Sequence, residues 1–390
     1  MRFAVEKSEL IQHIQHLSSI ISTKAASPIL TNYLIEADEK KGEVKITATD
    51  LKITSVVILN AAVSEGGIIA VSANYFNSII SQMPDSVINI WQNEDLLMIQ
   101  CNKIDFNILC ADYTLFPQLS LPNFENATLV NAETFHRMIS KTVFAVSTDV
   151  NRPVLTGVCW KIMEKVNLMA ATDGRKVAEI IVPNTAASAT ESGEENIDES
   201  IFDAPYSEQY LEKIIPVKAL NFLQKIYDPA IKEMKVIFER NNIIFGYNNY
   251  IVVSNIIDHN YPEYEKALLV ELPHRLVLPK ESLMQSIRRV ALIAPEDSGR
   301  VKFDVDKDRF EISTFNKETG EAKEIIDKYE YSGAVTSISF NNKYMLSILD
   351  AIDTEQVLIK LGDSKDPILI FNEPPLKNQK ITFLLMPLRT

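Results

Sequence analysis

The chain has 390 residues, more than one hydrophobic core usually supports, so we expect two or three domains. Its hydrophobic content is 46%, no apolar run approaches the roughly 18 residues of a membrane span, and residues 1–10 lack a signal-peptide pattern. We therefore expect a cytoplasmic protein without a membrane partner. The formal net charge of −13 argues against a nucleic-acid partner unless positive charge is concentrated locally.

Two sequence patterns each occur three times along the chain, which indicates an internal repeat. The first is a strand, a polar capping residue and an amphipathic helix, and the second is a further helix later in each repeat. The equivalent apolar positions are Leu10, Phe135 and Leu283 in the first pattern, and Phe76, Leu220 and Met345 in the second. Because apolar residues recur at helical spacing, one stripe of each helix should face a sheet.

The predicted helices span residues 6–17, 74–82, 132–145, 218–227, 280–292 and 342–352. Between and after them, residues 43–59, 234–257 and 300–315 alternate apolar and polar side chains, as antiparallel strands do. The sequence thus predicts an α+β fold of three related domains, each with two helices packed on antiparallel sheets. We expect the domains to span residues 1–122, 123–270 and 271–390.

The spacing of the repeats predicts an insertion. Equivalent positions of the first helices are 125 and 148 residues apart, whereas those of the second helices are 144 and 125 apart. About 20 extra residues therefore lie inside the second repeat. The segment 184–208 contains seven acidic residues and no Lys or Arg, so we expect it to form an acidic surface loop.

Positive charge is enriched on the predicted helices. Their six windows hold nine Lys and Arg residues against five acids, in a chain with 39 bases and 52 acids. Exposed helix faces often carry Lys and Arg, so this count alone does not identify a DNA-binding surface. It gains weight if all the helices face a common centre.

The segment 170–178, AATDGRKVA, ends an apolar run with a compact polar cluster. A catalytic role for Thr172, Asp173 or Arg175 would need a nucleophile and a base within reach, and no His or Cys lies nearby in the sequence. A phosphate-binding loop is disfavoured because the chain has neither GxxxxGK nor GxGxxG. Since ATD recurs at residues 48–50, we interpret Asp173 as a structural residue that caps a turn.

The histidines and cysteines do not indicate a metal or cofactor site. The five histidines form no metal-binding pattern, and His13 and His16 share a helix face on which we expect them to be solvated. Cys101, Cys110 and Cys159 lie in apolar runs without CxxC spacing, which favours buried free thiols. We expect no metal, no cofactor and no catalytic residue.

Four features together resemble the bacterial sliding clamp family, the β subunit of DNA polymerase III. They are the three repeats, the paired TATDL (47–51) and AATDGRKVA segments, NYPEY (260–264) and the terminal LLMPLR (384–389). The resemblance covers the whole chain. It implies a non-catalytic processivity factor, in which two chains close head to tail into a ring around duplex DNA. The implied protein partners are the polymerase catalytic subunit, the clamp loader and other proteins with a clamp-binding motif.

The resemblance also implies site residues. One part of a peptide-binding pocket would be formed by Leu155, Thr172, Gly174, Arg175, Val177 and Pro262, and the other by Asn341, Tyr344, Met386, Pro387, Leu388 and Arg389. The implied DNA contacts are Lys24, Arg152 and Lys218. The dimer interface would join Phe106, Asn107 and Ile108 of one chain to Leu292 and Ile293 of the other.

Two other classes of function remain open from the sequence. A β-rich scaffold that binds proteins without encircling DNA would share the predicted pocket. An enzyme is disfavoured because no constellation of catalytic residues is present.

Overall fold

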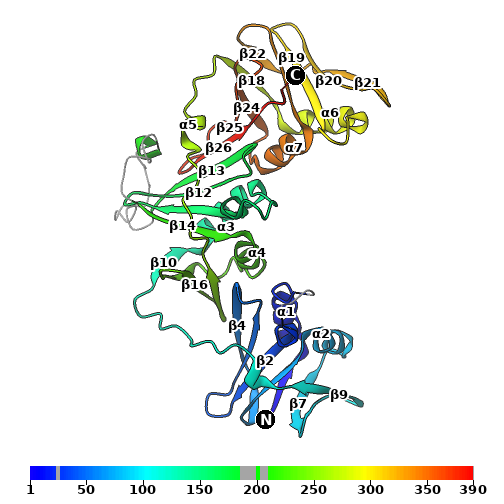
Figure 1. Ribbon diagram of the computed structural model, residues 1–390, viewed down its shortest axis with the longest axis vertical. Coiled ribbons are helices and arrows are strands. Elements are labelled where there is room, and N and C mark those ends of the chain that lie inside the picture. The colour runs from blue at the N-terminus through cyan, green and yellow to red at the C-terminus, as the bar shows by residue number, and fades with distance from the viewer. Residues whose placement is uncertain (23–26, 185–198, 203–209, 390) are drawn as a thin grey trace. The chain divides into compact units, whose positions relative to one another are not determined.

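The computed structural model describes residues 1–22, 27–184, 199–202 and 210–389 (Figure 1). The chain separates into two compact units. Unit 1 comprises residues 1–136 and 218–256, and unit 2 comprises residues 137–217 and 257–390. The second repeat therefore contributes to both units. No helix among the described residues is long and apolar enough to cross a membrane.

The first repeat begins with a strand that leads directly into a helix. Its elements are β1 (Arg2–Glu6), α1 (Lys7–Leu17), a 3-10 turn (Pro28–Thr31), β2 (Asn32–Asp38), β3 (Glu43–Thr49), β4 (Ile53–Asn60), β5 (Ala62–Glu65), β6 (Gly67–Ser72), α2 (Ala73–Gln82), β7 (Val87–Asn93), β8 (Leu96–Cys101), β9 (Ile104–Ala111) and a 3-10 turn (Tyr113–Leu115).

The second repeat follows the same order with one strand fewer between its two helices. Its elements are β10 (Thr128–Asn131), α3 (Ala132–Thr142), 3-10 turns (Val143–Ala145 and Pro153–Thr156), β11 (Gly157–Ile162), β12 (Val166–Thr172), β13 (Lys176–Pro183), a 3-10 turn (Glu199–Phe202), β14 (Leu211–Pro216), α4 (Val217–Lys225), β15 (Glu233–Phe238), β16 (Asn242–Tyr247), β17 (Tyr250–Asn255) and α5 (Glu265–Leu268).

The third repeat completes the chain. Its elements are β18 (His274–Pro279), α6 (Lys280–Val290), a 3-10 turn (Ala291–Ile293), β19 (Arg300–Val305), β20 (Phe310–Asn316), β21 (Gly320–Ile325), β22 (Glu330–Ser332), β23 (Thr336–Asn341), α7 (Asn342–Ala351), β24 (Gln356–Leu361), β25 (Ile368–Glu373) and β26 (Lys380–Leu385). All six predicted helices are confirmed, and the short α5 was not predicted.

Strand pairing joins neighbouring repeats. Unit 1 contains a 13-stranded antiparallel sheet in which β4 of the first repeat pairs with β17 of the second. Unit 2 contains a nine-stranded antiparallel sheet in which β13 of the second repeat pairs with β26 of the third. A further sheet in unit 2 has four strands in the order β21-β20-β19-β23. At each of these two junctions, strand pairing satisfies the backbone N–H and C=O groups on the edge strands of two neighbouring repeats.

The helices bury the apolar stripe that the sequence predicts. The aligned positions Leu10, Phe135, Leu283, Phe76, Leu220 and Met345 are all at most 2% exposed. Each aligned position is therefore buried, as the repeat predicts.

The predicted polar capping residue is present at only some helix starts. Asn131 Oδ1 accepts a hydrogen bond from Thr134 N in α3, and Asn341 caps α7. At α1 and α6 the preceding residues are Glu6 and Pro279, and neither makes a side-chain cap. The prediction of a shared polar cap is wrong for these two helices. They begin where the preceding strand ends, and packing of the buried stripe stabilises them instead.

The buried-thiol prediction is correct for two of the three cysteines. All three are free, Cys101 and Cys159 are buried, and Cys110 is partly exposed. Of the predicted acidic loop at 184–208, residues 185–198 and 203–208 lie outside the described residues. Within the described part, Phe202 is buried.

Candidate functional site

The segment 172–176 forms a tight turn between β12 and β13. Thr172 Oγ1 donates to the carbonyl of Lys176 at 2.7 Å and accepts from Gly174 N at 3.0 Å. Asp173 Oδ1 accepts from the backbone N–H groups of Arg175 and Lys176 at 2.8 and 3.0 Å. Gly174 has φ of +86°, a left-handed conformation that glycine adopts without steric cost. Asp173 is therefore a turn-capping residue.

The first repeat contains the same turn between β3 and β4. Thr49 Oγ1 donates to the carbonyl of Ile53 and accepts from Leu51 N. Asp50 Oδ1 accepts from the N–H groups of Lys52 and Ile53, both at 2.9 Å. Since the ATD sequence builds one turn twice, its structural interpretation is confirmed.

The segment 260–264 of the second repeat is hydrogen-bonded to this turn and to β13. The Tyr261 hydroxyl accepts a hydrogen bond from Thr172 N at 3.0 Å, and Tyr264 Oη donates to Glu179 Oε2 at 2.8 Å. Both tyrosines are buried, whereas Pro262 between them is exposed. Sequence analysis identified Pro262 but missed the two tyrosine hydroxyls. The sequence signal that could have identified them is the YPEY motif, in which a tyrosine stands on either side of Pro-Glu.

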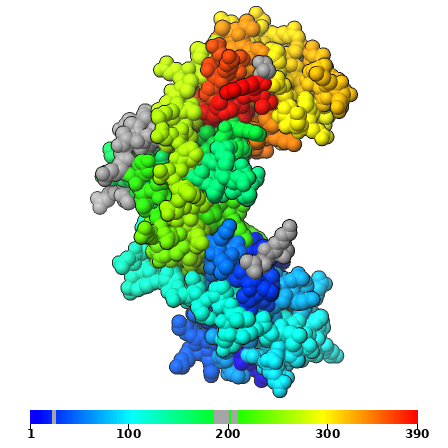
Figure 2. All heavy atoms as spheres, viewed as in Figure 1, coloured from blue at the N-terminus to red at the C-terminus, as the bar shows by residue number. Residues whose placement is uncertain are grey.

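The C-terminal tail, residues 386–389, bridges the turn and the third repeat. Met386 N donates to the carbonyl of Arg175 at 2.8 Å, which extends the pairing of β26 with β13 by one residue. Leu388 N donates to the carbonyl of Ser339 in β23 at 2.8 Å. These two bonds hold the tail beside the start of α7. The tail belongs to the C-terminal end of the chain, which is red in Figure 2.

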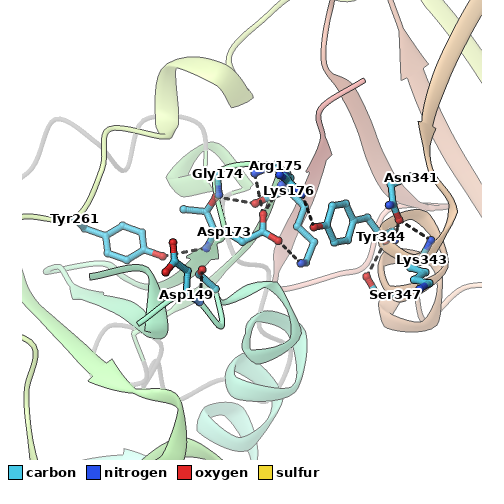
Figure 3. A network of polar contacts seen from close by, with 12 residues as sticks. Asp149, Asp173, Gly174, Arg175, Lys176, Tyr261, Asn341, Lys343, Tyr344 and Ser347 are labelled. Carbon is cyan, nitrogen blue, oxygen red and sulfur yellow. Dashed lines mark hydrogen bonds and ion pairs between the residues drawn. The ribbon is translucent and has the colours of Figure 1, made fainter. Parts of the chain in front are cut away.

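Two cations of the turn contact one aromatic ring of α7 (Figure 3). Arg175 Nη1 donates to Tyr344 Oη over a long 3.4 Å, and Lys176 Nζ lies 4.4 Å from the centroid of the Tyr344 ring. Lys176 Nζ also pairs with Asp173 Oδ2 at 2.6 Å. At the start of the helix, Asn341 Oδ1 accepts from the N–H groups of Lys343 and Tyr344.

The predicted pocket residues lie on these connected elements. Gly174, Arg175, Pro262, Met386 and Arg389 are exposed, and Asn341, Tyr344, Pro387 and Leu388 are partly exposed. Leu155, Thr172 and Val177 are buried. We call the nine exposed and partly exposed residues the turn–tail surface.

The three residues predicted to contact DNA differ in their surroundings. Lys24 lies outside the described residues. The Arg152 guanidinium lies beside Gly174, because a Cβ added to that glycine would be 3.3 Å from Arg152 Nη1. Lys218, at the start of α4, pairs with Asp50 Oδ2 at 2.6 Å and donates to the carbonyl of Ile20 at 2.8 Å. Burial would raise the pKa of Asp50, but hydrogen bonds from Lys218 and the backbone lower it below its usual value.

The predicted interface residues lie at open positions in each unit. In unit 1, β9 pairs with β8 along its length but meets β6 only at Cys110 and Ala111, so the other edge of 104–109 has no strand partner among the described residues. Phe106 and Asn107 are exposed there, and Ile108 is partly exposed. In unit 2, β21 ends the four-stranded sheet, and Leu292 is 84% exposed while Ile293 is partly exposed.

The expectation that His13 and His16 are solvated is wrong. Both side chains are partly buried, and their Nδ1 atoms lie within hydrogen-bond distance of the Tyr250 hydroxyl in β17, at 2.8 Å for His16. Burial, together with the neighbouring His16, lowers the pKa of His13 to about 4. The sequence pattern located one helix face but not the strand that covers it.

Two further observations bear on small ligands. A cavity of about 300 Å³ in unit 2 is lined by residues that include Phe202, Leu358, Phe371 and Leu376 with Lys360 and Lys380, and none of its lining residues belongs to the turn–tail surface. Among the described residues, no group of three or more His, Cys, Asp or Glu side chains is placed to hold a metal ion.

Three repeats of two helices on antiparallel strands, joined by strand pairing and ending in the turn–tail surface, define a DNA clamp. Sequence models of the three domains of one family match the chain in order. The N-terminal domain of the DNA polymerase III beta subunit matches residues 1–120, the central domain matches 129–197 and 200–263, and the C-terminal domain matches 271–389. The chain belongs to the DNA polymerase III beta subunit family, the sliding clamps.

Individual relatives are similar over their full length. The beta sliding clamp of Staphylococcus aureus is 28% identical over 400 residues, with 100% of both chains covered. The solved structure of the DNA polymerase sliding clamp from Bacillus subtilis is 27% identical, with a TM-score of 0.86 over 100% of this chain and 99% of that one. The beta subunit of Streptococcus pyogenes shares the fold with a TM-score of 0.88 over 100% of both chains at 23% identity.

Proposed function

We propose that two copies of this chain close head to tail into a ring that encircles duplex DNA and tethers the replicative polymerase to it. The observation that carries this proposal is the ordered match of all three domains of one clamp family to one chain. In this role the chain performs no catalytic step and needs no cofactor, and it acts in the cytoplasm, where bacterial DNA lies.

A ring reconciles DNA association with the net charge of −13. A protein that holds DNA by affinity makes many phosphate contacts, and its binding falls steeply with salt. An encircling protein is retained by topology instead, so a modest number of cations suffices and no base needs to be read. Lys24, Arg152 and Lys218 are the candidate contacts with the DNA backbone. Lys218 would exchange its pairing with Asp50 for a phosphate.

Ring closure is proposed to join β9 of one copy to β21 of the other. Both strands have an unpaired edge among the described residues, and each lies near exposed apolar side chains, Phe106 at 41% and Leu292 at 84%. Pairing two such edges satisfies their backbone groups and buries an apolar centre within a charged rim.

The test of encirclement compares circular with linear DNA. Loaded onto nicked circular duplex, the protein should remain bound in moderate salt and be lost when the circle is linearised, because only a free end releases a ring. The measurement is gel filtration of protein with DNA before and after cleavage at one site. Equal retention on both forms would exclude the ring and favour a scaffold that does not encircle DNA.

We further propose that the turn–tail surface binds peptide segments of the polymerase catalytic subunit, the clamp loader and other proteins with a clamp-binding motif. The exposed Met386 and the partly exposed Pro387 and Leu388 supply apolar contacts, and Gly174 allows a partner backbone to approach closely. Leu155 and Val177 would form the buried floor beneath them.

Removal of residues 386–390 should therefore abolish binding of a polymerase-tail peptide while leaving the dimer mass unchanged. Contacts of this kind are each worth roughly 2 kcal/mol or more, so an affinity loss of at least tenfold is expected. Fluorescence anisotropy of a labelled peptide measures it. Wild-type affinity in the truncated chain would exclude the tail from the site.

A further inference from the structure

The cavity in unit 2 lies on the sheet that joins the second and third repeats. Its lining includes Leu358 of β24, Phe371 of β25 and Ile381 of β26, which are neighbouring strands (Figure 1). Leu358 and Phe371 are partners across their strands. Phe202, which is buried, lines the cavity from the second repeat. A volume of about 300 Å³ lined largely by apolar side chains is at the lower end of the range for small-ligand sites.

The two amide side chains that line the cavity have defined orientations. Asn372 Oδ1 accepts from the backbone N–H of Asp353 at 2.8 Å, and Gln379 Oε1 accepts from Arg137 Nε at 2.6 Å. Both partner groups can only donate, so each amide oxygen is identified by its bond. The two NH2 groups, Asn372 Nδ2 and Gln379 Nε2, make no hydrogen bond within the described residues. The amides therefore have donors to spare.

Lysine side chains add positive charge to the same lining. Lys360 Nζ lies 5.4 Å from the centroid of the Phe371 ring and makes no ion pair with any residue that the structure describes. Lys380 Nζ donates to the carbonyl of Phe202 at 3.3 Å. None of the described residues that line the cavity is Asp or Glu. The cavity is therefore electropositive although the chain as a whole carries a net charge of −13.

The side-chain polar groups available to a ligand are thus N–H donors and cations around an apolar interior. A donor shielded from water without an acceptor costs free energy, and an anion accepts from several donors at once. We propose that this cavity binds a small carboxylic acid with an apolar body. Its carboxylate is held by the amide donors and Lys360, and its body packs against Phe202 and Phe371.

This site is separate from the proposed peptide-binding and DNA-binding functions. None of the cavity's lining residues belongs to the turn–tail surface or to the candidate DNA contacts. Because Phe202 belongs to the second repeat and the other lining residues to the third, a bound acid would contact both repeats. A ligand that binds only the folded chain stabilises it, so the acid should raise the melting temperature.

The test compares octanoate, 1-octanol and octylammonium, which share one hydrocarbon chain and differ in charge. Each is titrated into the full-length chain by calorimetry below the concentration at which it forms micelles. We expect octanoate to bind about tenfold more tightly than octanol, because charge-assisted hydrogen bonds are stronger than neutral ones, and octylammonium to bind least. Octanoate should also raise the melting temperature more than either of the other two probes.

Gln379→Glu is the sharpest variant, because it keeps the oxygen that accepts from Arg137 and replaces the NH2 group with a second oxygen. It should weaken octanoate binding about tenfold and strengthen octylammonium binding, since the new charge repels one probe and attracts the other. Gln285→Glu is the control. Gln285 lies in α6 outside the cavity lining, so this variant should bind all three probes as the wild type does.

Two further variants separate the charge of the cavity from its volume. Lys360→Gln should weaken octanoate binding and leave octanol binding unchanged. Lys302→Gln, which removes a lysine paired with Asp304 in β19, should change neither. Leu358→Trp should fill the cavity and prevent binding of every probe. Leu358 is partly exposed, so the larger side chain has room at the surface, and an unchanged dimer mass would confirm the fold.

The remaining outcomes would overturn the proposal. Equal affinity for octanoate and octanol would exclude recognition of a carboxylate. Failure of all three probes to bind, or unchanged octanoate binding by Leu358→Trp, would exclude the cavity as the site. Tighter binding of an acetylated, amidated leucyl-aspartate than of octanoate would identify the occupant as an acidic protein segment instead of a small acid. None of these results would alter the proposed ring or the turn–tail surface.

Discussion

Gly174 and Leu51 occupy the same position in two copies of one turn, with φ of +86° and +74°. Leucine is therefore compatible with the turn, at a cost of roughly 1–2 kcal/mol for the left-handed conformation. Formation of the turn therefore does not by itself require glycine at position 174. Gly174 differs from Leu51 in that Arg152 lies close to it. We also propose that the backbone of a partner peptide binds there.

Gly174→Leu should consequently fold and dimerise but bind a polymerase-tail peptide at least tenfold more weakly, because the new side chain occupies the place of the peptide backbone. Leu51→Gly is the control and should leave peptide binding unchanged. Peptide anisotropy and dimer mass are the measurements. Wild-type affinity of Gly174→Leu would mean that the turn does not contact the peptide.

The two turns also differ in the cation that pairs with their aspartate. Asp173 pairs with Lys176 of its own turn, whereas the equivalent position in the first repeat is Ile53 and Asp50 pairs with Lys218 of α4. One substitution thus determines whether the aspartate is satisfied locally or links two repeats. The same turn can therefore border a binding surface in one repeat and stabilise a contact between repeats in the other.

At the scale of elements, α1, β17 and α4 meet in unit 1 around the Tyr250 hydroxyl. His13 and His16 of α1 contact it, Phe222 of α4 packs against its ring, and Lys225 Nζ of α4 donates to the carbonyl of Gln15 at 2.6 Å. Burial lowers the pKa of both histidines, with His16 adding to the effect on His13 and Lys225 to that on His16. The junction therefore favours the neutral form of both imidazole side chains.

Acid should therefore destabilise this junction. The pKa of His13 falls from 6.5 in the unfolded chain to about 4 in the folded chain, so the unfolded state binds protons first. The histidine contribution to the free energy of unfolding is fully present above about pH 6.5 and declines as the pH drops toward 4. Urea denaturation followed by tyrosine fluorescence measures it. His13→Gln with His16→Gln should flatten the profile over this range, and an unchanged slope would exclude the histidines as its cause.

At the scale of the whole molecule, ring closure depends on surfaces that a single chain leaves exposed. Leu292 is 84% exposed, so replacing it with a charge should not disturb the fold of one chain. Within the proposed interface the same charge would be buried without a partner, which costs several kcal/mol.

Light scattering at micromolar concentration should give about twice the chain mass of 44.0 kDa for the wild type and the single mass for Leu292→Glu. Val335→Glu is the control, because Val335 is 81% exposed in the loop between β22 and β23 and should leave the dimer intact. A monomeric wild type, or a dimeric Leu292→Glu, would contradict the proposed closure.

The sequence by itself determined the repeats, the six helices and the turn. Leu10, Phe135 and Leu283 could be aligned because helical periodicity is a local signal, and each is buried as expected. Asp50 and Asp173 could be recognised as capping residues because their hydrogen bonds reach only two or three residues ahead. The family resemblance then supplied the turn–tail residues.

Only the tertiary structure decided which distant groups satisfy one another. Tyr261 accepts from Thr172 across 89 residues, and Tyr250 meets His16 across 234, so no periodicity links either pair. The pairing of Asp173 with Lys176 and the hydrogen bond of Arg175 to Tyr344 depend on side-chain directions that a sequence does not specify. Local hydrogen bonds and periodic burial are encoded within one turn or strand, whereas these contacts exist only after strand pairing has joined the repeats.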